Sequence, residues 1–146
     1  MINRLSAKDV TRIIECNDRI YTSGRRYDHK IARMCLECLK DKTIVLFSNY
    51  PFEITEGIQE ALDNRKLIIF DNMDTIHILH TISMNPKNDE MTKNEIIIIG
   101  IDERQEATKF VKELHNYEGR LVFVDNNLNR KEDELKEIRM YVDVCL

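Results

Sequence analysis

Four short runs of apolar, mostly β-branched residues stand out along the chain. They cover residues 43–48, 67–71, 95–101 and 121–125, and their hydrophobic positions are consecutive rather than alternating. Continuous apolar runs of this length are typical of strands that are buried on both faces, as in parallel sheets covered by helices. The pattern therefore predicts one parallel sheet with helices on both of its faces.

Segments with helical periodicity separate these runs. Ser6 with Asp9 resembles a capping box at the start of the first helix, and Asp102 with Gln105 resembles a second one. Such boxes satisfy the first backbone N–H groups of a helix and so mark where it begins. The predicted helices span about residues 6–17, 28–40, 51–64, 73–83, 102–118 and 130–142.

Other stretches give mixed signals. Pro51 suits the first turn of the third helix, and Ile54 would then belong to its apolar stripe. Residues 20–22 allow a short extended piece, and residues 85–94 are typical of a polar loop. Residues 140–146 fit either the end of a helix or an edge strand, and both alternatives stay open.

Together these elements predict an α/β protein: a three-layer α/β/α sandwich of the Rossmann-like type, with a mainly parallel sheet of four or five strands. We expect residues 1–146 to form a single α/β domain. Residues 1–40 would supply the N-terminal helices, and residues 41–146 the alternating strand–helix units.

Composition narrows the classes of function. The net charge of −4 gives no overall nucleic-acid signature. No apolar run approaches the ~20 residues of a membrane-spanning helix, and the first ten residues lack the apolar core of a signal peptide. The sequence therefore predicts a cytoplasmic protein without a membrane partner, whose four cysteines are free thiols.

Polar residues follow the four predicted strands, namely Asn49, Asp71, Asp102 and Asp125. Ligands of open parallel sheets bind at the carboxyl ends of strands, so these residues are candidate ligand-binding groups. The three carboxylates together could hold Mg²⁺ for phosphoryl chemistry. The alternative is that all four residues only cap helices and favour turns.

Cofactor motifs are missing from the sequence. It contains neither G-x-G-x-x-G nor G-x-x-x-x-G-K-[ST], the two glycine motifs that cradle phosphates. No serine-hydrolase elbow of the form G-x-S-x-G is present either. We therefore assign no cofactor and no metal from the sequence.

Positive charge is concentrated in residues 19–33. Arg19, Arg25, Arg26 and Arg33 are candidates for binding a polyanion, and two tyrosines lie among them. Cations grip phosphates and aromatic rings stack on bases, so this segment could bind RNA or a nucleotide. The alternative is a solvated helix start whose arginine stems cover apolar surface.

The succession of "TIVLFSNYP", "KLIIFDN" and "EIIIIGIDERQEATKFVKEL" after two N-terminal helices resembles the element order of the L7Ae/L30e RNA-binding family over residues 10–114. The resemblance would imply RNA binding. However, "GRRYDHK" stands where that family has a glycine–asparagine–glutamate signature, so its RNA-contacting residues do not carry over. The further unit "RLVFVD" fits a Rossmann-like sandwich better.

Three functions compete at this point. The missing catalytic motifs favour a non-enzymatic module that binds a protein partner or a small ligand. The arginine-rich segment favours a protein that binds RNA or nucleotide phosphates. The acidic strand ends favour a metal-dependent phosphoesterase-like enzyme.

Cys35 and Cys38 form a C-x-x-C pair, and His77 and His80 form a second i, i+3 pair. Helical spacing places both cysteines in the buried stripe of their helix and both histidines towards solvent. Free cysteine packs as a small hydrophobe, so we predict neither zinc nor a disulfide here. Metal analysis of protein purified without added metal should find no zinc. Near-stoichiometric zinc that is lost on Cys38→Ser would contradict this prediction.

Overall fold

The computed structural model describes residues 5–72, 74–84 and 94–146. Its strands are β1 (Arg19–Ser23), β2 (Thr43–Ser48), β3 (Leu67–Asp71), β4 (Glu95–Ile101), β5 (Arg120–Asp125) and β6 (Val144–Cys145). They form one six-stranded sheet in the order β3-β2-β4-β5-β1-β6, and every neighbouring pair is parallel. The protein therefore has the expected Rossmann-like α/β/α fold, although its sheet has six strands and not the four or five predicted, because Arg19–Ser23 and Val144–Cys145 both pair into it.

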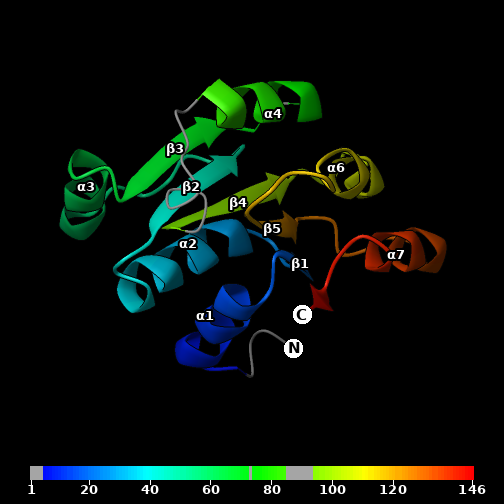
Figure 1. Cartoon of the computed structure of the whole chain (residues 1–146), viewed down its shortest axis with the longest axis horizontal. Coiled ribbons are helices and arrows are strands. Elements are labelled where there is room, and N and C mark those ends of the chain that lie inside the picture. The colour runs from blue at the N-terminus through cyan, green and yellow to red at the C-terminus, as the bar shows by residue number, and fades with distance from the viewer. Residues whose placement is uncertain (1–4, 73, 85–93) are drawn as a thin grey trace.

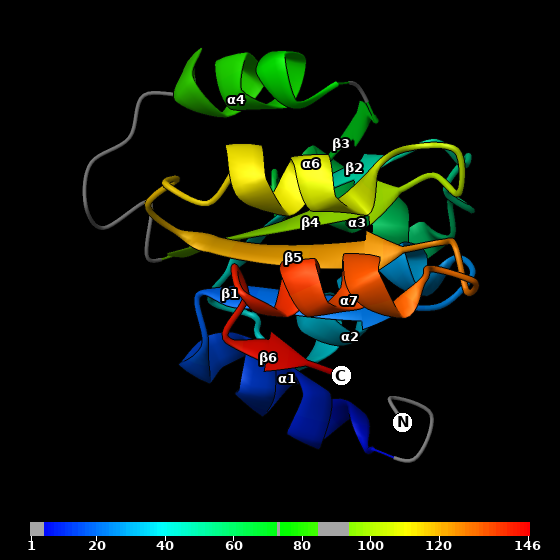
Figure 2. The same cartoon turned by 90° about the vertical axis from the view of Figure 1, so that its right-hand side faces the viewer.

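Helices cover both faces of this sheet (Figures 1 and 2). The described helices are α1 (Ala7–Cys16), α2 (Tyr27–Cys38), α3 (Glu56–Asp63), α4 (Thr75–Met84), α6 (Ala107–Glu113) and α7 (Glu132–Arg139). Helices α1, α2 and α3 lie on one face, and α4, α6 and α7 lie on the other. No helix in the described ranges is both long enough and apolar enough to cross a membrane.

Each face has its own hydrophobic core. Alternate side chains of β4 point to opposite faces: Ile96 and Ile98 pack beneath α2, whereas Ile97 and Ile99 pack beneath α6. All seven residues of β4 are buried, because the strand lies between β2 and β5. A run of four isoleucines suits this position, since both faces of the strand exclude water.

The four predicted strands are confirmed within one residue. The extended piece expected at residues 20–22 belongs to β1, which pairs with β5. The C-terminal alternatives are also resolved, because α7 ends at Arg139 and Val144–Cys145 pair with β1 as an edge strand. Residues 85–93 of the predicted polar loop lie outside the described residues.

The helix predicted to begin at Asp102 in fact begins at Ala107. The backbone N–H of Asp102 donates to Oε1 of Gln105, 2.9 Å away, as in a capping box. The carbonyl oxygen of Gln105, however, accepts a hydrogen bond from Arg130, 2.7 Å away, instead of one from a helical N–H. This long-range contact holds residues 102–105 in a turn, and the sequence pattern does not reveal it.

The prediction for Pro51 and Ile54 was also wrong. Residues 51–55 are non-helical, and α3 begins at Glu56 with the side chain of Thr55 accepting the N–H of Ile58. The irregular segment brings Phe52 into the core, where only 9% of it is exposed, while 51% of Ile54 is exposed. Burial of the aromatic ring takes precedence over the helical stripe.

Cys35 is fully buried on the inner side of α2, but Cys38 is exposed, contrary to the prediction that both are buried. The helix ends at Cys38, and Leu39 leaves the helical conformation and takes the buried position instead. His77 and His80 are exposed, as predicted. All four cysteines are free thiols in the structure.

Burial raises the pKa of the Cys35 thiol from its ordinary value of 9.0 to about 12. We therefore expect a thiol reagent at about pH 8 to modify Cys16 and Cys38 rapidly, Cys145 more slowly because burial raises its pKa, and Cys35 only after unfolding in urea. Because the folded-state pKa lies above the unfolded one, the stability contributed by the protonated Cys35 should be lost as the pH rises from 9.0 to about 12. Mass spectrometry of the labelled protein measures the first effect; rapid modification of all four thiols in the folded protein would contradict it.

Candidate ligand-binding site

The carboxyl ends of the strands lie along one edge of the sheet, where the connecting loops diverge. The loop after β2 leads to α3 on one face, whereas the loop after β4 leads to α6 on the other. The neighbouring strands β5 and β1 diverge in the same way, towards α7 and α2. Such divergence opens a crevice in α/β sheets, and this edge is therefore where a ligand is expected.

Asn49 and Asp102 meet at the divergence of β2 and β4. The side-chain amide of Asn49 donates to Oδ2 of Asp102 over 3.2 Å, and Oδ1 of Asp102 accepts the backbone N–H of Arg104. Asp71 lies at the end of the outer strand β3 and is exposed. Of the candidate ligand groups, only Asn49 and Asp102 are linked by a hydrogen bond.

Asp125 is fully buried, and both of its carboxylate oxygens accept hydrogen bonds from other residues. Oδ2 accepts from the Tyr21 hydroxyl at 2.6 Å and from Nε of Arg130 at 2.9 Å, and Oδ1 accepts from Arg130 and from the Asn127 backbone. Burial and the hydrogen bond to Asp125 raise the pKa of Tyr21. Arg130 also holds the carbonyl of Gln105, so this network joins two loops and leaves the Asp125 carboxylate little room for a ligand.

Metal coordination finds little support in this arrangement. Across residues 5–72, 74–84 and 94–146, no group of three or more His, Cys, Asp or Glu side chains is placed to hold a metal ion. The carboxylates of Asp102 and Asp125 are engaged in separate networks. In the described residues, Asp102 and Asp125 thus hydrogen-bond within separate loops and do not converge on one metal-binding centre.

A buried polar cluster lies beneath the first turn of α2, and the sequence did not predict it. Asp28 is fully buried, and its Oδ2 accepts the Ser48 hydroxyl at 2.7 Å. Nε2 of His29 lies 3.0 Å from the same hydroxyl oxygen, which also accepts the backbone N–H of Tyr50. A Cβ on Gly100 would lie 2.4 Å from the Asp28 carboxylate, so only glycine fits there. The glycine within "IIIIGI" was the one sequence signal for this cluster.

The junction between β1 and α2 has a partial phosphate-loop spacing. Gly24 and Lys30 stand where G-x-x-x-x-G-K-[ST] has its first glycine and its lysine, but His29 and Ile31 replace the second glycine and the hydroxyl residue. Helix α2 already begins at Tyr27, whose ring packs directly on Gly24. The backbone that would cradle a phosphate is therefore helical, and anion contacts at this junction depend on side chains.

Arg26 stands at this junction with its backbone fixed by a neighbouring side chain. Its backbone adopts the left-handed conformation with φ 58°, and its N–H donates to Oδ1 of Asn126 over 2.9 Å. The guanidinium lies 5.3 Å from the centre of the Tyr50 ring. Further along α2, the guanidinium of Arg33 lies 4.9 Å from the Phe52 ring, and one of its nitrogens lies 3.8 Å from a carboxylate oxygen of Glu53.

Arg19 does not join the other arginines. It lies at the opposite end of β1, where its guanidinium donates to the carbonyl oxygens of Asp18, Gly119 and His115. Only 8% of Arg19 is exposed, and burial lowers its pKa. Its role is to tie the amino end of the sheet together, whereas Arg25 is exposed beside Arg26.

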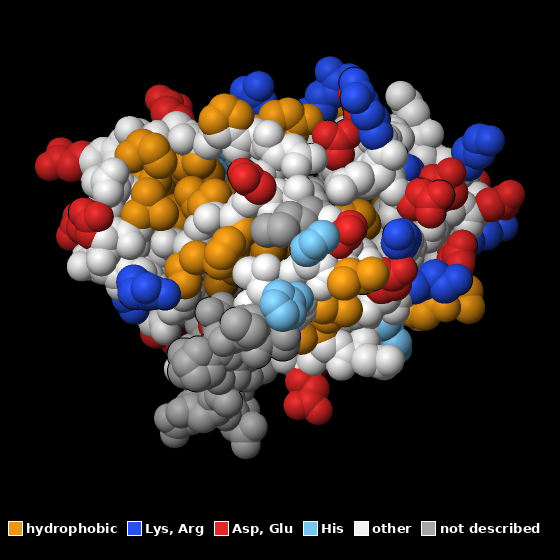
Figure 3. Space-filling model, turned by 90° about the horizontal axis from the view of Figure 1, so that it is seen from above, with side chains coloured by type: hydrophobic (Ala, Val, Ile, Leu, Met, Phe, Trp, Pro, Cys, Tyr) orange, Lys and Arg blue, Asp and Glu red, His pale blue; other side chains and the backbone are white. Residues whose placement is uncertain are grey.

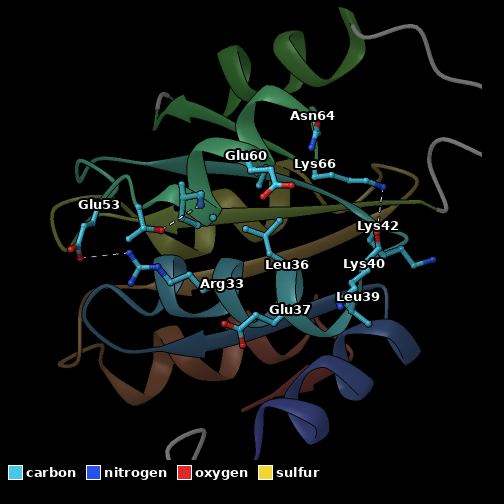
Figure 4. A pocket seen from close by; sticks show the side chains of 14 residues that line it. Arg33, Leu36, Glu37, Leu39, Lys40, Lys42, Glu53, Glu60, Asn64 and Lys66 are labelled. Atoms are coloured by element: carbon cyan, nitrogen blue, oxygen red, sulfur yellow. Dashed lines mark hydrogen bonds and ion pairs between the residues drawn. The ribbon is translucent and has the colours of Figure 1, made fainter.

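The remaining cations line a pocket of about 470 Å³ between α2 and the loop after β2. We call it the basic pocket; its lining residues are Arg26, His29, Lys30, Arg33, Met34, Glu37, Pro51 and Glu53. A groove of about 750 Å³ between α2 and α3 adjoins it (Figure 4). Arg33, Glu37 and Glu53 border both hollows, and the Arg33–Glu53 ion pair lies at their boundary.

The Asp125 network yields a stability prediction. Arg130→Ala leaves a buried carboxylate without its cation, which should lower the free energy of unfolding by about 3–5 kcal/mol. The matched control is Arg139→Ala, which breaks the exposed pair with Glu132 and should cost less than about 1 kcal/mol. Urea unfolding measures both. Equal effects of the two variants would refute the structural role assigned to Asp125.

Comparison with known proteins adds no identification. No protein-family model matches the chain, and no curated protein shows significant sequence similarity to it. The resemblance in element order to an RNA-binding family thus receives no support from these comparisons. The function has to be inferred from the geometry of the site.

Proposed function

We propose that this cytoplasmic protein acts by binding, and that its basic pocket holds the phosphate groups of a nucleotide, either free or within single-stranded RNA. The observation that carries the proposal is the convergence of Arg26, Lys30 and Arg33 on one concave surface. The protein as a whole is acidic, with a net charge of −4, whereas the pocket has three cations against two carboxylates.

The charge of the pocket favours an anion. Burial lowers the pKa of His29, so this side chain is neutral at pH 7 and the permanent positive charge comes from the two arginines and Lys30. Glu37 and Glu53 also line the pocket and offset part of this charge, Glu53 through its ion pair with Arg33. Arg26 and Lys30 are then the main phosphate-binding groups, with the exposed Arg25 just outside the pocket.

The geometry of Arg26 favours phosphate in particular. Its backbone is fixed by Asn126, and its guanidinium lies over the Tyr50 ring, so less side-chain freedom is lost when it binds. A planar guanidinium presents paired N–H donors that match two oxygens of a phosphate. This preorganisation distinguishes Arg26 from a freely solvated surface arginine.

Aromatic rings beside the cations favour a nucleotide over inorganic phosphate. Tyr50 is half-buried beneath the Arg26 guanidinium, with the His29 ring edge-on to it at 6.5 Å between centroids. A base can stack on the guanidinium plane or on the tyrosine ring, as in proteins that bind single-stranded nucleic acid. The basic pocket and the adjoining Tyr50 ring, which contacts the lining residues Arg26 and His29, therefore combine a phosphate-binding and a base-stacking element.

The competing functions fit the described residues less well. A metal-dependent phosphoesterase needs several free carboxylates at one point, but Asp125 is saturated by Arg130 and Tyr21. A protein partner would use the groove between α2 and α3, whose lining mixes charges of both signs, as that of the basic pocket does, but lacks the Arg26–Tyr50 pair. Neither alternative explains why three cations gather around the basic pocket.

Fluorescence anisotropy with two probes, a labelled uridine oligonucleotide of about twelve residues and labelled ATP, tests the proposal. Arg26→Asn combined with Lys30→Ala should weaken binding about tenfold at about 50 mM salt and reduce the RNA salt dependence by about 1.4 log units per log unit of salt. Asparagine is chosen at position 26 because it tolerates the left-handed backbone.

The control removes the same charge elsewhere. Lys8→Ala with Arg12→Ala deletes two exposed cations from α1 and should leave binding nearly unchanged. Binding of both probes indicates a site for free nucleotides, and binding of the oligonucleotide alone indicates RNA. If neither probe binds, or if both double variants lose affinity equally, the proposal is wrong.

A further inference from the structure

Strand β3 forms one margin of the sheet, and within the described residues its outer side pairs with no other strand. Ile68, Ile69 and Phe70 are only half-buried there, whereas every residue of the central strand β4 is buried. Figure 3 looks onto this end of the molecule and shows hydrophobic side chains exposed between charged ones. Proteins usually protect such an edge with lysine, proline or a bulge, and Leu67–Asp71 contains neither of these residues.

The hydrogen bonds to β2 identify which backbone groups of β3 point away from β2. The N–H of Ile44 donates to the carbonyl of Lys66, and the N–H of Asn72 donates to the carbonyl of Ser48. Even-numbered residues of β3 therefore direct their N–H and C=O groups towards β2. Because these groups alternate in direction along a strand, those of Leu67, Ile69 and Asp71 point outward.

We infer that a second copy of this chain adds its own β3 antiparallel to this edge, which joins two sheets into one across a two-fold axis at Ile69. In that register Ile69 lies opposite Ile69 of the second copy, and Ile68 lies opposite Phe70. Leu67 and Asp71 form the flanking hydrogen-bonded pairs. Two-fold dimers of this kind use the same surface of both subunits.

Charge complementarity favours a second copy of the chain as the partner and the antiparallel direction of pairing. Arg65 immediately precedes the strand region and Asp71 ends it, so an antiparallel copy brings the cation of one chain towards the carboxylate of the other. Arg65 lies in the turn just before the strand, two residues from Leu67, which pairs with Asp71 of the second copy, so its long side chain can reach that carboxylate. A parallel copy would instead place like charges together.

Charge reversal tests the pairing. Arg65→Asp and Asp71→Arg should each weaken dimerisation about tenfold, because each places like charges on the two-fold pair. The double variant exchanges the charges and should recover most of the affinity. Aspartate is used at position 65 because the backbone there is left-handed, with φ 57°. Sedimentation equilibrium over a range of protein concentrations provides the dimer affinity.

Hydrogen exchange on the unmodified protein gives a second test that does not depend on any variant. Raising the protein concentration should slow exchange at the outward N–H groups of Ile69 and Asp71. The N–H groups of Ile68 and Phe70 face β2 and should exchange equally at all concentrations, so they are the internal control. If the protein is a monomer at every concentration, or if the double variant dimerises no more tightly than either single variant, the inference is wrong. The edge would then be available to a strand from another protein.

Discussion

The buried carboxylate of Asp28 determines where the candidate site lies. It packs against Gly100 in the middle of the sheet and accepts the Ser48 hydroxyl, so the first turn of α2 is fixed above the end of β4. The same hydroxyl holds the backbone of Tyr50, which begins the loop on the other side of the basic pocket. Both walls of the pocket therefore depend on one polar cluster, in which a side chain larger than glycine at position 100 would clash with the carboxylate.

A second buried carboxylate organises the opposite face. Asp125 is paired with Arg130, and Arg130 also holds the turn that follows β4 through the carbonyl of Gln105. Buried ion pairs are not strong sources of stability in themselves, because desolvation offsets most of the attraction. Their value here is positional, since the removal of either partner leaves an unpaired charge and releases two loops together.

These two clusters explain why the cations, and not the acids, are the better functional candidates. The buried acids Asp28 and Asp125 hold loops in place and are inaccessible to a ligand. Arg26 and Lys30, in contrast, are exposed at the surface of the basic pocket. Not every cation of the basic segment is free to bind an anion. The guanidinium of Arg19 donates to three carbonyl oxygens at the far end of its strand.

The sequence by itself determined the layers, four of the six strands and their parallel arrangement. Continuous β-branched runs such as residues 95–101 can be buried only between two layers of helices, so a local pattern is sufficient to predict them. Only the tertiary structure decided which polar residues are free to bind. That outcome depends on contacts such as Arg130 with Gln105 and Asp28 with Gly100, which join residues far apart in the chain. A local pattern contains no information about such pairs, because their geometry arises when the strands take their order in the sheet.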